Sequence, residues 1–129
     1  MSSKQMIKNW LLKAKKDVET AKDLYKLKHY DWCLFIWHLA IEKALKAKIA
    51  SLEKEYLFTH KLINLAKLAE YPINKETLEQ LREITSFNIE ARYDDYKLSF
   101  YKKATQEYTS KWIKICDSFF KLIIESIHE

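Results

Sequence analysis

The sequence predicts an all-α fold, an up-and-down helical bundle of four long helices plus one short helix. Of its 129 residues, 48% are hydrophobic and 14% are aromatic, which argues against a disordered chain. The chain contains no Gly and a single Pro. Because the favoured hairpin turns of a sheet need Gly or Asn at positive φ, this composition favours helices with few connections. A chain of this length is expected to form a single domain, residues 1–129.

The first helix is expected from about Ser3 to Lys26. Apolar residues recur there at steps of three and four, which is the period of one helical face. They are Ile7, Leu11, Ala14, Val18, Ala21 and Tyr25. Ser2 or Ser3 can cap this helix, since a hydroxyl oxygen accepts a hydrogen bond from a free backbone N–H of the first turn.

The second helix is expected to be the central element of the bundle, capped by Asp31 and ending near Glu53. Its first half, from Trp32 to Ile41, is apolar on nearly every side, as in a helix that other helices enclose. Its second half is amphipathic, because charged residues interrupt the apolar ones. These are Glu42, Lys43, Lys46 and Lys48.

The remaining elements are shorter or less regular. Thr59 is expected to cap a third, short helix that Tyr71-Pro72 stops, because the residue before Pro is pushed away from helical angles. Asn74 begins a fourth helix, and the polar stretch Ser86–Ser99 is interpreted as an irregular connection. The last helix is expected from about Lys102 to Ile127.

The charge and the sulfur atoms give little support for specialised chemistry. The formal net charge is +5, but only Arg82 and Arg92 are arginines among 23 basic residues. A dispersed Lys surface lacks the planar fork that reads phosphates and bases, so it makes a poor sequence-specific reader of nucleic acid. Cys33 and Cys116 form no CxxC pair and are interpreted as buried free thiols.

No cofactor, metal or membrane span is expected. A Gly-rich phosphate loop is impossible without Gly. A di-iron bundle requires Glu-x-x-His pairs on facing helices, whereas the sequence offers a single such pair, Glu125 and His128. His38 and Glu42 lie one turn apart, but a single pair does not form a metal site; His38 is expected to bond Glu42 or the backbone. The longest apolar run is too short for a membrane span, and no signal peptide is recognisable, so the expected location is cytoplasmic.

One stretch fits neither core nor ordinary helix surface, and it lies at Ala91–Lys97. It brings a guanidinium, two phenols and two carboxylates together between two helices: Arg92, Tyr93, Asp94, Asp95 and Tyr96. Functional residues concentrate on such connections. The structural alternative is an Arg–Asp pair that fixes the loop, with the Tyr rings packed on the bundle.

Three motifs together resemble the HEPN domain family. The motifs are Ala40-x-Glu42-Lys43-Ala44-Leu45-Lys46-Ala47, then Thr59-His60-Lys61-Leu62, then Ala91-Arg92-Tyr93-Asp94, in the order and spacing of that family. The resemblance covers essentially the whole chain. It implies a helical bundle that usually forms a homodimer. Small prokaryotic members are often paired with a minimal nucleotidyltransferase chain, and some such pairs are toxin–antitoxin modules.

In the toxin members of this family, the HEPN chain is a metal-independent ribonuclease whose motif is an Arg followed after four to six residues by a His. Arg92 matches the Arg, whereas the positions of the His hold Lys97, Leu98 and Ser99. Cleavage through the 2′-hydroxyl needs an acid and base with a pKa near neutrality, which His supplies. The prediction therefore contains no catalytic residue.

The leading hypothesis is a non-catalytic, homodimeric partner of a nucleotidyltransferase, with nucleotide or RNA as a further ligand. Its recognition surface is expected to combine Arg92, Tyr93, Asp94 and Asp95 with Glu42, Lys43 and Lys46 of the central helix. Glu42 is expected near Arg92, and Asp94 or Asp95 near Lys43 or Lys46. A bound nucleotide would meet Arg92 and Lys46 through its phosphates and stack on Tyr93 or Tyr96. The alternatives are a ribonuclease toxin that uses Arg92 and a stand-alone structural dimer.

Overall fold

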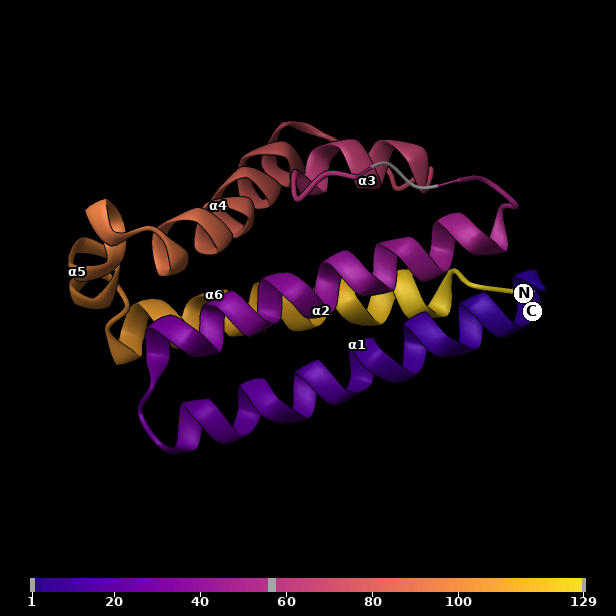
Figure 1. The fold of residues 1–129 in the computed structure, drawn as a ribbon. Helices are drawn as coiled ribbons and strands as arrows, with labels where there is room; N and C mark the ends of the chain where they lie inside the picture. The colour runs from indigo at the N-terminus through magenta and orange to yellow at the C-terminus, as the bar shows by residue number, and fades with distance from the viewer. Residues whose placement is uncertain (1, 56–57, 129) are drawn as a thin grey trace.

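The computed structural model describes residues 2–55 and 58–128, and its regular structure in that part is all helical (Figure 1). The helices in chain order are α1 (Ser3–Lys26), α2 (Tyr30–Ser51), α3 (Leu62–Leu68), α4 (Lys75–Arg92), α5 (Asp94–Lys103) and α6 (Gln106–Glu125). The all-α class is therefore confirmed, with four long helices and, in the described residues, two short ones where the sequence predicts one. No helix in these residues has the length and apolar character that a bilayer crossing requires.

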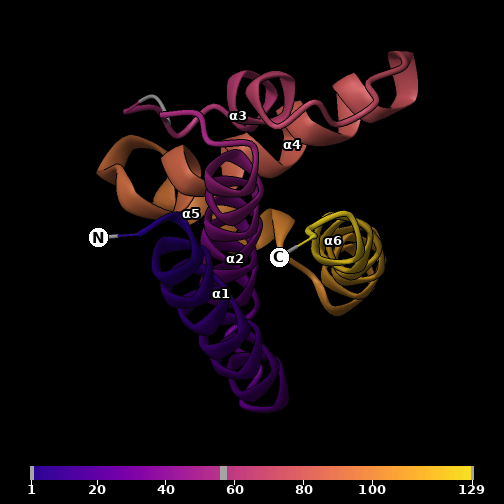
Figure 2. The same cartoon turned by 90° about the vertical axis from the view of Figure 1, so that its right-hand side faces the viewer.

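Helix α2 is the centre of the bundle. It contacts each of the other described helices, and Figure 2 shows it enclosed by α1, by the layer of α3 and α4, and by α6. Twelve of its 22 residues are buried. The apolar side chains on nearly every side of Trp32–Ile41 require this enclosure, so the predicted role of the helix is confirmed.

The region Ser86–Ser99 is mostly helical, and its prediction as an irregular connection is wrong. Helix α4 continues to Arg92 because Phe87, Asn88 and Ala91 form a buried inner face. At Tyr93 the backbone becomes extended, with φ −94° and ψ 130°, and α5 begins at the next residue.

The two aspartates that predicted a turn occupy the first turn of α5 instead. Asp94 and Asp95 lie where a negative charge interacts favourably with the helix dipole. The last helix consequently begins later than predicted, at Gln106. Its cap is Thr105, whose Oγ1 accepts a hydrogen bond from the Tyr108 N–H at 3.2 Å.

Two of the predicted caps are confirmed and two are wrong. Ser2 Oγ accepts from the Gln5 N–H at 3.3 Å, and Asn74 Oδ1 accepts from the Thr77 N–H at 2.8 Å. Asp31 lies inside the first turn of α2, which begins after His29. Thr59 lies too early to cap α3, whose N-cap is Lys61; its Oγ1 instead accepts from the Lys61 N–H at 3.1 Å.

Helix α5 lies at one end of the bundle (Figure 1). Phe100 is its buried residue, and its ring lies 5.7 Å from that of Phe87 on α4. Lys103 pairs with Glu83 at 3.0 Å and approaches Glu90 at 3.8 Å, which fixes the other end of α5 to α4. The other side chains of α5 therefore remain at the surface.

Candidate functional site

The predicted Arg92 stretch forms an exposed junction between α4 and α5. Arg92 Nη1 donates to Asn88 Oδ1 at 3.1 Å, one turn earlier on α4, and Asp94 pairs with Lys97 at 3.2 Å within α5. Tyr93 and Tyr96 are 57% and 50% exposed. Arg92 thus binds a neutral amide, and both phenol rings face solvent, so the alternative of an Arg–Asp pair with packed rings is not what the structure shows.

The central-helix residues of the predicted surface bind other partners. Glu42 is 4% exposed, accepts from His60 Nδ1 at 2.8 Å and lies 3.5 Å from Lys46 Nζ. Lys43 donates to Asp17 of α1 at 2.6 Å. The charged residues of the first family motif therefore pair within the bundle and not with the Arg92 stretch.

The expected proximity of the two halves of the surface is therefore wrong, for a geometric reason. The junction of α4 and α5 lies at the end of the bundle where α2 begins, as Figure 1 shows, and the last residues of α5 lie beside Tyr30 and Asp31. Glu42 lies twelve residues beyond Tyr30, which is roughly 18 Å along a helix. The two halves consequently lie at different heights along α2.

The structure instead joins two of the three family motifs, through a group of four side chains that we call the α2 polar cluster: His38, Glu42, Lys46 and His60. His38 Nε2 lies 3.1 Å from the backbone carbonyl of His60, whose ring binds Glu42. The ammonium of Lys46 lies 5.1 Å from the centre of the Trp10 ring on α1. The cluster fixes the segment before α3 to α2.

The participation of His60 in this cluster was missed from the sequence. The other three members, His38, Glu42 and Lys46, recur every four residues, so they share one helical face. That spacing was a visible signal for a polar stripe on an otherwise apolar helix. It could not identify the partner, because His60 lies beyond the end of α2.

The hydrogen bond at His38 determines which nitrogen carries its proton. A carbonyl oxygen only accepts, so Nε2 donates to it and Nδ1 is left without a proton. His38 is fully buried, and its Nδ1 has no hydrogen-bond partner among the described residues. Burial lowers the pKa of His38 below its usual value of 6.5; the carbonyl of His60 and the charge of Glu42 oppose this effect. His38 is therefore a neutral core residue.

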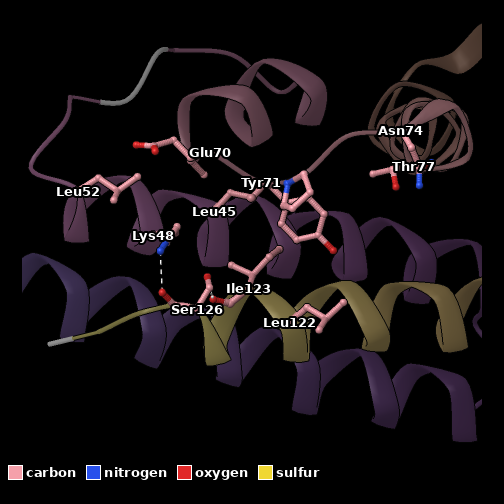
Figure 3. Close-up of a pocket in the computed structure, with 12 residues that line it drawn as sticks. Leu45, Lys48, Leu52, Glu70, Tyr71, Asn74, Thr77, Leu122, Ile123 and Ser126 are labelled. Carbon is pink, nitrogen blue, oxygen red and sulfur yellow. Dashed lines mark hydrogen bonds between the residues drawn. The ribbon is translucent and has the colours of Figure 1, made fainter.

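A separate cavity of about 570 Å³ lies between α2, the α3–α4 connection and the end of α6 (Figure 3). Its size is typical of ligand pockets, and its lining is mainly apolar. Three of its polar side chains have partners within the protein. Lys48 Nζ donates to the Ser126 carbonyl at 2.6 Å, Asn74 caps α4, and Glu70 pairs with Lys54 at 3.0 Å. The cavity does not include any residue of the predicted surface.

The described residues contain no group of three or more His, Cys, Asp or Glu side chains placed to hold a metal ion. Cys33 and Cys116 are free and buried, as interpreted from the sequence. Burial raises the pKa of the Cys33 thiol to about 12, which keeps it protonated and unreactive at neutral pH.

Comparison with known families supports the assignment that the motifs suggest. The family model of the HEPN domain matches residues 7–127, nearly the whole chain. The chain belongs to the HEPN domain family. This HEPN chain is also similar to the crystal structure of TT1696 from Thermus thermophilus, with a TM-score of 0.77 and 20% identity, over 92% of this chain and 96% of that chain. At this identity the similarity concerns the fold. A comparison with curated proteins finds no match.

The burial of His38 predicts a loss of stability in mild acid. The folded state holds the imidazole neutral, whereas the unfolded chain takes up a proton near pH 6.5. The free energy of unfolding should therefore be highest above that pH and fall as the pH drops below it. Urea unfolding between about pH 7.5 and 5.5 should show this slope, and His38→Gln should reduce it. His29→Gln, at an exposed position, should keep the wild-type slope; equal slopes in the three proteins would contradict the argument.

Proposed function

We propose that this HEPN protein is a non-catalytic, homodimeric partner of a separate minimal nucleotidyltransferase in a toxin–antitoxin-like module. The observation that carries the proposal is a HEPN match over residues 7–127 in a chain with Lys97, Leu98 and Ser99 where ribonuclease members place a His. The HEPN bundle is retained, whereas the imidazole that would act as acid and base is absent from these positions.

The exposed apolar side chains around α5 support an interface. We call this group the α5 patch, and it consists of Ile89, Tyr93, Tyr96, Leu98 and Tyr101, each 47–65% exposed. Tyr is enriched at protein interfaces, because its ring is apolar and its hydroxyl is polar. A two-fold dimer would place this patch against its own copy. Tyr93 of this patch follows Arg92 directly in the sequence, so dimerisation and recognition would occur at the same end of the bundle.

The contacts of α2 restrict the recognition surface. Lys43 and Glu42 already bind partners within the bundle, and Lys46 contacts both Glu42 and Trp10. Recognition of a partner or of a nucleotide is therefore assigned to the exposed half of the predicted surface. That half consists of Arg92, Tyr93, Asp94 and Asp95. Arg92 would meet a phosphate, and a Tyr ring would stack on a base.

The proposed dimer makes a prediction about mass. Light scattering should give twice the chain mass of 15.5 kDa at micromolar concentration. Tyr96→Glu should produce the single-chain mass, because burying a carboxylate in an aromatic interface is strongly unfavourable in free energy. Leu12→Glu is the matched control, because Leu12 is 69% exposed on α1, and this variant should remain dimeric. A wild-type protein with the single-chain mass would refute the dimer.

The proposed partner is tested by co-purification. A tagged copy of this chain, expressed together with the nucleotidyltransferase frame beside its gene, should retain that protein on an affinity column. Arg92→Ala together with Asp95→Ala should weaken retention, whereas Lys67→Ala on the exposed surface of α3 should not. The absence of such a frame, or a failure to retain its product, would favour a stand-alone structural dimer.

The ribonuclease alternative is tested with cellular RNA. We expect the purified protein to leave RNA intact on a denaturing gel, because an exposed Lys ammonium at the position of the motif His is a poor base near neutral pH. Cleavage that persists through purification and disappears in Arg92→Ala would overturn the non-catalytic assignment.

A further inference from the structure

A small hollow lies where the beginning of α3 packs against α4, apart from the surface assigned above. Its volume is about 310 Å³, and it is lined by Lys61, Ile63, Asn64, Arg82 and Thr85. Two of these five residues are cations, and no carboxylate lines the hollow. Arg82 and Arg92 are the arginines of the chain, and they are separated along α4 by ten residues, roughly 15 Å.

The two cations lack acidic partners in the described part of the chain. Neither Arg82 nor Lys61 has an ion pair within 4.0 Å among residues 2–55 and 58–128. Glu83, the next residue on α4, binds Lys103 at 3.0 Å, and Glu79, one turn before Arg82, does not line the hollow. Two like charges in one hollow repel each other, and an anion between them would convert this repulsion into attraction.

Two hydrogen bonds of Thr85 fix the backbone around the hollow. The Leu62 N–H donates to Thr85 Oγ1 at 3.2 Å, and the same hydroxyl donates to the Leu81 carbonyl at 2.8 Å. This bond ties the start of α3 to the middle of α4, and it holds Lys61 and Asn64 against Arg82. Thr85 has no donor left over, so the available side-chain N–H donors belong to Lys61, Asn64 and Arg82.

The donor set matches a phosphate group. Arg presents a planar fork of five N–H donors that suits phosphate oxygens, Lys adds a mobile point charge, and the Asn amide adds two neutral donors. Ile63 gives one apolar contact, and about 310 Å³ is at the lower end of ligand pockets. We propose that Lys61, Asn64 and Arg82 bind the phosphate group of a small phosphorylated molecule.

The test is a titration of isotope-labelled protein with inorganic phosphate, in which amide NMR shifts are measured. A parallel titration with chloride at the same concentration is the reference. Shifts around Asn64 and Arg82 should saturate. Arg82→Gln should weaken binding about tenfold, and Arg82→Lys should weaken it less, since it keeps the charge and loses the fork. Arg82 is exposed, so Arg82→Gln should retain the wild-type circular dichroism spectrum.

Two control variants separate a site from general charge. Lys67→Gln removes one exposed charge from α3 outside the hollow, and Lys75→Gln removes one from α4; both should keep the wild-type affinity. Shifts that never saturate, or an equal loss in Lys67→Gln and Arg82→Gln, would overturn the site. Arg92→Gln tests the proposed function separately, because it should weaken partner retention and leave the phosphate-dependent shifts around Asn64 and Arg82 unchanged.

A second titration with adenosine monophosphate identifies the source of the phosphate. Tighter binding than that of inorganic phosphate, with the same dependence on Arg82, would assign the site to a phosphomonoester whose organic part contacts Ile63. Equal affinity would assign it to free phosphate. Shifts that centre on Arg92 and are the same in the wild-type protein and in Arg82→Gln would refute binding at the hollow.

Discussion

The enclosure of α2 by the other helices is the constraint on which the rest of the structure depends. A helix buried along its length must satisfy its polar side chains within the protein, because an unpaired polar or charged group in the core is costly. His38 and Glu42 are both buried, and each has a partner in the segment around His60. The HEPN motif in this helix therefore holds the bundle together, and its charged side chains pair with groups inside the protein.

Because the charged side chains of this motif have partners inside the bundle, recognition of other molecules is left to the helices that cover α2 from one side. α4 carries both arginines of the chain, and both are exposed. One lies beside the start of α3 in a hollow without carboxylates, and the other lies beside the α5 patch. Since roughly 15 Å of helix separates them, the same rigid element can present two independent recognition points.

The sequence was sufficient where the determining information is local. The three- and four-residue steps of α1, the all-round apolar half of α2 and the capping residues Ser2 and Asn74 each act within one or two helical turns. It was insufficient where tertiary packing decides. Asp94 and Asp95 are typical turn residues, but the buried Phe100 holds the segment after them as a helix. The candidate site depends on such packing even more, since the bond from His60 to Glu42 spans eighteen residues.

The charges beside the α5 patch bear on how the proposed partner chain would be recognised. Arg92 is bound to the neutral Asn88, and Asp95 makes no ion pair within the described residues. A partner chain that carries a carboxylate and a cation at matching positions can therefore form an ion pair with each of them. A partly desolvated pair of this kind contributes more to specificity than to affinity. Arg92 would then select the partner, a role that needs a guanidinium and does not need an imidazole. The proposed recognition is therefore compatible with Lys97, Leu98 and Ser99 at the positions of the motif His.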